Sequence, residues 1–173
     1  MSKLFVAVFP PPAVREDLRR VLPADGRFTR PSKWHVTLAF LGEVDDARLP
    51  SVTDALATVP APAAFSLRLT GGGRFGPVAW AGLAGDLRKL GALRESVRVA
   101  LDDAGFTIDP RPFRPHLTVS YHQDRGLLTA LAGYAGPTWP VTDFALVESA
   151  LGNYHVRQEW ALPPNPSPDQ HHT

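Results

Sequence analysis

The chain of 173 residues contains no cysteine. Disulfides, thiolate metal sites and cysteine nucleophiles are therefore excluded as sources of stability or chemistry. No apolar run approaches the roughly 20 residues that a membrane-spanning helix needs. The formal net charge is only +1, so no field of one sign covers the whole protein. Any anion-binding site has to be built from local residues.

The composition, 44% hydrophobic and 20% charged, is typical of a globular protein. The apolar start at residues 4–9 is too short for a signal peptide and runs into three prolines, so it predicts a first strand. We expect a cytoplasmic monomer with one domain over residues 1–162. Residues 163–173, rich in proline and polar side chains, are expected to form a disordered tail.

One short phrase occurs twice in the chain, as His35-Val-Thr37-Leu and as His116-Leu-Thr118-Val. Each phrase lies in an apolar, β-prone run, and residues i and i+2 of a strand point to the same face. Each strand would therefore present one imidazole and one hydroxyl side by side. Two such pairs, facing one another, would provide an acid, a base and two hydrogen-bond donors to phosphate oxygens.

A single phrase of this kind would arise by chance in about one chain in ten or twenty of this size. One copy would more often be a strand histidine with a structural hydrogen bond than a catalyst. Two copies in one chain are far rarer, and they favour a functional reading. The pattern predicts cleavage of a phosphodiester by two histidines, with no cofactor and no metal.

Hydrophobic periodicity predicts an α+β fold in the order β-α-β-α-β-β-α-β-β-β. The expected strands are residues 3–9, 34–41, 65–69, 78–83, 116–121, 142–151 and 154–162, and the expected helices are 13–22, 45–59 and 86–104. Because 81 residues separate the two motif histidines, a pseudo-symmetric pair of lobes is the simplest arrangement that brings the motif strands together.

Other candidate residues carry weaker signals. The run Gly71-Gly72-Gly73 lacks the Lys-Ser/Thr of a phosphate-binding loop, and we interpret it as a flexible turn. His122 is expected at the surface or at the rim of a site, and no role is assigned to His155. His171 and His172 fall in the expected tail.

The two motifs resemble those of the two-histidine (2H) phosphoesterase superfamily, and within it the RNA 2′,3′-cyclic phosphodiesterases, also called 2′-5′ RNA ligases. The resemblance extends to residues 34–44, 75–82, 111–118 and 148–160, in the same order along the chain. It implies a bilobal α+β fold, with two antiparallel-sheet lobes, outer helices and the motif strands lining a central cleft.

The resemblance also implies roles for individual residues. His35 would be the general acid toward the leaving oxygen and His116 the general base toward water, although the symmetry of the two motifs does not rank them. Thr37 and Thr118 would bind phosphate oxygens. Phe40 would stack on the terminal nucleobase, with a place in the core as the alternative.

One position departs from the family pattern. Many relatives carry an arginine soon after the second motif, where this chain has Tyr121. Arg114 is our candidate for the missing phosphate-binding cation, with Arg111 and Arg125 as further cations near the second motif.

The sequence thus predicts metal-independent hydrolysis of RNA 2′,3′-cyclic phosphate ends to 2′-phosphate ends. Reverse 2′-5′ ligation of RNA could use the same site. A non-catalytic nucleotide- or RNA-binding module and a phosphodiesterase for small cyclic nucleotides stay open as alternatives.

Overall fold

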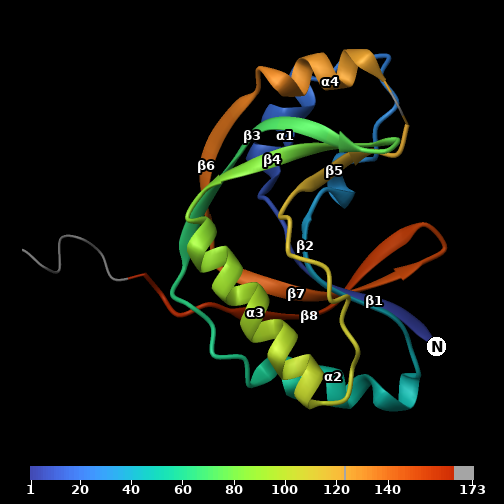
Figure 1. Ribbon diagram of the computed structural model, residues 1–173, viewed down its shortest axis with the longest axis vertical. Helices are drawn as coiled ribbons and strands as arrows, with labels where there is room; N and C mark the ends of the chain where they lie inside the picture. Colours follow the sequence, from blue (N-terminus) through green and yellow to red (C-terminus); the bar gives the residue numbers. More distant parts are fainter. Residues whose placement is uncertain (123, 166–173) are drawn as a thin grey trace, which may run out of the picture.

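The computed structural model describes residues 1–122 and 124–165, which form eight strands and four α-helices (Figure 1). In chain order these are β1 (Ser2–Val8), α1 (Pro12–Val21), β2 (Val36–Val44), α2 (Leu49–Ala57), β3 (Phe65–Phe75), β4 (Val78–Gly85), α3 (Leu87–Asp103), β5 (Leu117–Ser120), α4 (Arg125–Ala132), β6 (Ala135–Val141), β7 (Asp143–Ala150) and β8 (Asn153–Ala161).

All eight strands belong to one curved antiparallel sheet with the order β6-β3-β4-β5-β2-β1-β7-β8. The central strands β5 and β2 pair at a single position, Val36 opposite Leu117. The sheet therefore consists of two four-stranded halves joined at the two motif strands. The predicted α+β class with two antiparallel lobes is confirmed, the lobes being halves of one continuous sheet.

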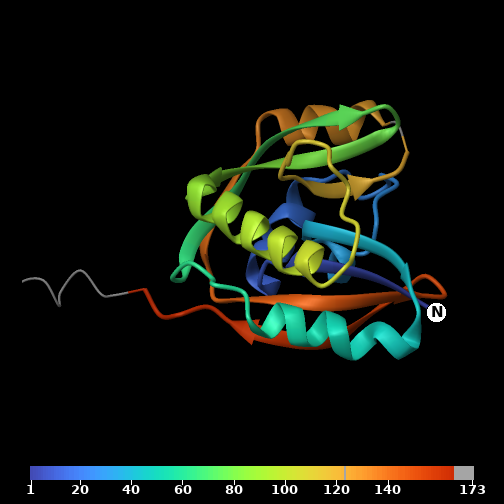
Figure 2. The same ribbon diagram turned by 60° about the horizontal axis from the view of Figure 1, so that its bottom comes forward.

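Two of the helices, α1 and α3, pack across the junction between the two halves of the sheet. The helix α1 follows β1 but packs against β6 in the other half, and α3 follows β4 but packs against β2. The helix α4 covers β3 and β4 at one end of the molecule, and α2 lies beside α3 at the other (Figures 1 and 2). One apolar core joins both halves, with Leu4 and Leu38 from one and Leu67 and Leu117 from the other.

The predicted element order was wrong in omitting α4 and β6. The helix α4 has only eight residues, too few for a clear periodic signal. The strand β6 contains Pro137 and Pro140, which argue against a strand in sequence. It lies at the edge of the sheet, paired only with β3, and an edge strand tolerates proline because one of its sides needs no hydrogen-bond donors.

The glycine run was also interpreted wrongly. Gly71, Gly72 and Gly73 lie inside β3, at a shift in its register with β4. A Cβ on Gly72 would lie 2.5 Å from the carbonyl oxygen of Trp80, and one on Gly73 would lie 2.6 Å from the Trp80 ring. Glycine is needed at positions 72 and 73 because β3 and β4 approach closely, and at Gly71 because its φ is +60°, in the left-handed region that favours glycine.

The boundary at residue 162 stays a prediction. Just beyond it, the carbonyl oxygen of Pro163 accepts a hydrogen bond from the Ala64 amide at 2.7 Å. The rest of the expected tail, residues 166–173, lies outside the described residues, together with His171 and His172.

Candidate active site

The junction between the two halves of the sheet brings the two motifs side by side. Antiparallel pairing of Val36 with Leu117 places Thr37 across from His116, and His35 across from Thr118. The two histidines are then diagonal cross-strand neighbours, for which Cα atoms lie about 7–8 Å apart. Val36 and Leu117 are completely buried, so the residues on either side of each project from the opposite face.

The His35 ring is held by both of its nitrogens. Its Nδ1 lies 2.7 Å from the carbonyl oxygen of Lys33. A carbonyl only accepts, so Nδ1 carries a proton, and in the neutral ring Nε2 accepts from the Thr37 hydroxyl at 3.0 Å. The ring stacks on Phe5 at 4.8 Å between centroids and meets the edge of Tyr154 at 5.4 Å.

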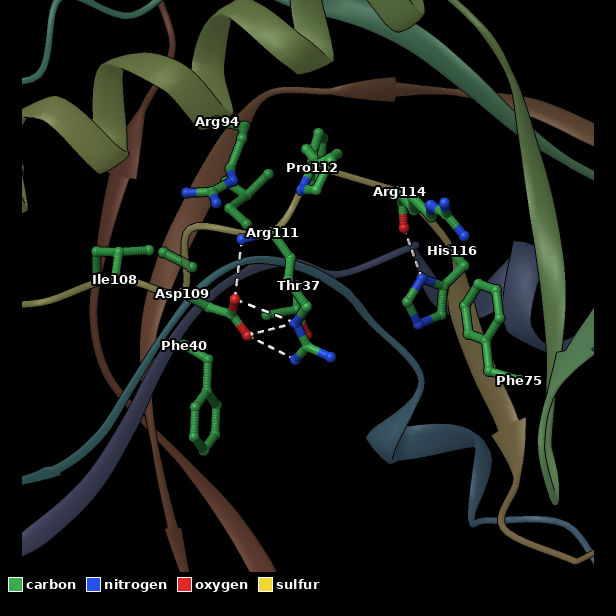
Figure 3. Close-up of a pocket in the computed structure, with 13 residues that line it drawn as sticks. Thr37, Phe40, Phe75, Arg94, Ile108, Asp109, Arg111, Pro112, Arg114 and His116 are labelled. Carbon is green, nitrogen blue, oxygen red and sulfur yellow. Dashed lines mark hydrogen bonds and ion pairs between the residues drawn. The ribbon is translucent and has the colours of Figure 1, made fainter.

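The second histidine shares the contact at Nδ1. His116 Nδ1 donates to the carbonyl oxygen of Arg114 at 2.6 Å, again two residues earlier in the chain (Figure 3). The His116 ring meets Phe75 edge to face at 5.1 Å and lies 6.2 Å from Trp80. Because Nδ1 is bonded to a carbonyl oxygen in both rings, Nε2 is the nitrogen of each neutral ring that can accept a proton.

The pKa of His35 depends on its surroundings and on the second histidine. Burial among aromatic rings lowers the pKa of His35 below its ordinary value, the hydrogen bond to the Lys33 carbonyl opposes this shift, and charge on His116 lowers the pKa further. In the unliganded protein His35 therefore favours the neutral form near neutral pH.

A cavity of about 630 Å³ opens beside the motifs. Thr37, Phe40, Arg114 and His116 line it, and His35 lies next to it through its hydrogen bond to Thr37. Thr118 is half-buried on β5, opposite Trp80 of β4. The residues predicted from the motifs are thus close together in the structure.

Phe40 reaches the cavity because β2 contains a bulge. Thr37 pairs with Ala7 and Ala39 with Val6, which leaves Leu38 without a partner on β1. A bulge shifts the alternation of side chains by one residue, so Leu38 and Ala39 are both buried and Phe40 is 48% exposed. Strict alternation would have placed Phe40 on the face opposite Thr37.

The predicted cations differ in position. Arg111 and Arg114 line the cavity, but Arg111 is bound to both carboxylate oxygens of Asp109 at 2.5–3.1 Å. Arg125 begins α4 and is exposed. It is not among the cavity's lining residues, and its expected place near the second motif stays a prediction.

The sequence analysis missed Arg94, which lines the same cavity and is only 8% exposed. A signal was present in the sequence. Arg94 follows Leu90 by four positions and precedes Val97 by three, so it lies on the apolar stripe of α3. A charged residue at such a position needs a specific reason.

The remaining histidines lie away from the cavity. His122 is exposed, and its amide donates to the Ser120 hydroxyl at 3.0 Å. His155 is exposed on β8, opposite Glu148.

Within residues 1–122 and 124–165, no group of three His, Asp or Glu side chains could hold a metal ion. None of the helices in the described part of the chain is long and apolar enough to cross a membrane.

Comparison with known proteins identifies the family to which the chain belongs. Residues 9–153 match the family model of the 2′-5′ RNA ligase superfamily. The chain is 35% identical over 166 residues to the RNA 2′,3′-cyclic phosphodiesterase of Thermus thermophilus, and the match covers 86% of this chain and 82% of the relative. A match to the Geobacillus stearothermophilus protein of the same name is 40% identical over 93 residues, but spans 50% of this chain and only 29% of that relative.

A solved structure shares the fold. The crystal structure of Escherichia coli LigT in complex with 3′-AMP has a TM-score of 0.78 and 26% sequence identity to this chain. The likeness covers 93% of this chain and 98% of that one.

Proposed function

Because the chain belongs to the 2′-5′ RNA ligase superfamily, we propose that it hydrolyses 2′,3′-cyclic phosphate ends of RNA to 2′-phosphate ends. The paired histidines at the junction of β2 and β5 are the observation that carries this proposal. The relative from Thermus thermophilus, named an RNA 2′,3′-cyclic phosphodiesterase, supports the substrate class.

In the proposed reaction water attacks phosphorus and the bond from phosphorus to the ribose 3′ oxygen breaks. His116 Nε2 takes the proton from the water, and His35 Nε2 gives a proton to the leaving 3′ oxygen. Each Nδ1–H is held by a backbone carbonyl, which fixes the tautomer and the orientation of the ring. This arrangement is what general acid–base catalysis at one phosphate requires.

Hydroxyls and cations would hold the phosphate. Thr37 and Thr118 would donate to its oxygens as negative charge develops on them. Thr37 is bonded to His35 in the free protein, so its hydroxyl would rotate toward the phosphate when substrate binds. Arg114, whose backbone already fixes His116, would place its guanidinium at the same phosphate, and Phe40 would stack on the terminal base.

The lowered pKa of His35 must be reconciled with its proposed role as the general acid. An acid must be protonated, and burial disfavours the charged form. A phosphate next to His35 would oppose this effect, because a negative charge within about 4–6 Å favours the protonated imidazole. His35 would thus become an acid mainly when substrate is bound.

The same site could join a 2′,3′-cyclic end to a 5′-hydroxyl in a 2′-5′ linkage, with the bond from phosphorus to the 3′ oxygen again breaking, as the superfamily's name suggests. The 5′-hydroxyl would take the place of water, and His116 would again accept the proton. Bulk water favours hydrolysis. We also propose a cytoplasmic, monomeric protein that uses no metal.

The proposal predicts a defined product. An oligonucleotide with a 2′,3′-cyclic phosphate, incubated with the protein in excess EDTA, should be converted to a 2′-phosphate end, as measured by chromatography against 2′- and 3′-phosphate standards. The same oligonucleotide with an open 3′-phosphate is the control and should stay unchanged.

Turnover of cyclic mononucleotides alone would favour the small-nucleotide alternative. Binding without turnover would favour the non-catalytic one, and loss of turnover in EDTA with recovery on adding a divalent ion would contradict the metal-independent mechanism.

A further inference from the structure

The buried arginine of α3 is the feature of the cavity that the proposed reaction does not use. Arg94 is only 8% exposed, and its Nη1 atom is buried with no hydrogen-bond partner among the described residues. Within the described residues no carboxylate lies at ion-pair distance from it. Arginine stays protonated in proteins, so a full positive charge is buried here without a direct counter-ion.

Such a charge is costly. Buried ions are normally paired or bound to a ligand, because a charge loses its favourable hydration when it is buried. Burial lowers the pKa of Arg94, and the charge of Arg98 adds to this, while Glu95 and Asp109 oppose it. The guanidinium lies 5.6 Å from the centroid of the Phe113 ring, a contact that orients the side chain without neutralising its charge.

The nearest carboxylate in the cavity is already engaged. Asp109 accepts hydrogen bonds from Arg111 on both oxygens, so its charge is largely balanced by that guanidinium. The lining residues include three arginines and one aspartate. The cavity therefore carries a surplus of two positive charges, although the whole chain has a net charge of only +1.

These charges lie apart within the cavity. Figure 3 shows His116, Arg114 and Phe75 at one side, Arg94 and Ile108 at the other, and Thr37 and Arg111 between them. The end near His116 is the one assigned to the cyclic phosphate. An anion at Arg94 would belong to a different group of the same ligand.

We propose that Arg94 forms a second anion subsite, which binds the 5′-phosphate of the terminal nucleotide while the cyclic phosphate lies between His35 and His116. In a nucleotide these two phosphates are on opposite sides of one ribose, as Arg94 and His116 are on opposite sides of the cavity. This inference rests on the proposed function. It narrows the substrate to nucleotides that carry a 5′ phosphate or phosphodiester, that is, RNA ends in preference to nucleoside cyclic phosphates.

Two stable product analogues test the subsite without turnover. Adenosine 2′,5′-bisphosphate should bind about 10- to 100-fold more tightly than adenosine 2′-monophosphate, the range expected for a hydrogen-bonded charge pair. Isothermal titration calorimetry on Arg94→Met should show this difference lost. Arg94→Lys keeps the charge but not the planar fork and should keep part of the difference. Arg88→Met, at an exposed position of the same helix, is the matched control and should keep all of it.

Turnover is measured in parallel on adenosine 2′,3′-cyclic phosphate with and without a 5′-phosphate. Equal affinity of the wild type for the two analogues, or a preference that survives both Arg94 variants, would overturn the subsite, even if both cyclic substrates are opened. A preference for the bisphosphate that depends on Arg94, with neither substrate opened, would support the subsite and contradict the proposed reaction.

Discussion

Replacing either motif histidine should reduce kcat for a 2′,3′-cyclic end by about 10²- to 10⁴-fold, the usual value of general acid or base assistance. His35→Ala removes the group proposed to protonate the leaving oxygen, and His116→Ala removes the group proposed to activate water. Each ring has its Nδ1 fixed by a carbonyl two residues earlier, and the alanine variant removes the oriented Nε2 atom. Steady-state kinetics with a defined oligonucleotide measures the loss.

The chain offers matched controls for this experiment. His122 and His155 are exposed and lie away from the cavity, so His122→Ala and His155→Ala should leave kcat within about twofold, the effect of an ordinary surface substitution. The double variant His35→Ala/His116→Ala should lose little more than the worse single variant, because groups that act as a unit are not additive. Near-normal turnover of either single variant would mean that its histidine has no catalytic role.

Replacing Trp34 should have the largest effect on stability among residues next to the motifs. Trp34 is 1% exposed, packs on Phe28, and donates from Nε1 to the Thr29 hydroxyl at 2.9 Å. Trp34→Ala should lower the free energy of unfolding by about 3–5 kcal/mol, the usual cost of truncating a buried aromatic residue. Chemical denaturation measures this loss.

Two further variants are compared with Trp34→Ala. Val156→Ala, at a position that is 50% exposed on β8, should change the free energy of unfolding by no more than about 0.5 kcal/mol. Trp34→Phe keeps most of the ring volume but leaves Thr29 without its donor, and should fall between the two. If Trp34→Ala were as stable as the Val156 variant, the packing described around the first motif would be wrong.

The motif residues could be found in the sequence because they are polar side chains within otherwise apolar strands. A histidine and a threonine at positions i and i+2 of an apolar strand put two polar groups on one face, and the chain does this twice. The class of fold followed from the periodicity of the longer elements. The helix over 86–104, for example, is observed as α3 at Leu87–Asp103.

The rest depends on tertiary contacts that no local pattern reports. The bulge at Leu38 turns Phe40 toward the cavity, and alternation alone predicts the opposite face. The single pairing of Val36 with Leu117 joins residues far apart in the chain. Position 72 needs glycine because a Cβ there would lie only 2.5 Å from the carbonyl oxygen of Trp80 on the neighbouring strand. Arg94 alone carried an overlooked sequence signal, as a charge on an apolar helix face.

The pH dependence of kcat/KM tests most directly whether the two histidines act as one acid–base pair on a shared phosphate. The wild type should give a bell-shaped pH profile, because one imidazole must be charged and the other neutral. The apparent pKa values of its two limbs belong to the coupled pair and not to either histidine alone. Since burial lowers the pKa of His35, the acidic limb should fall below the ordinary histidine value of about 6.5.

The residual activity of the single variants then assigns the roles. His35→Ala, which keeps only the proposed base, should become more active as pH rises, and His116→Ala, which keeps only the proposed acid, should become less active. The reverse pair of slopes would exchange acid and base and leave the pair intact. A wild-type profile with a single limb, or bells that persist in both variants, would contradict the central claim that His35 and His116 share one phosphate.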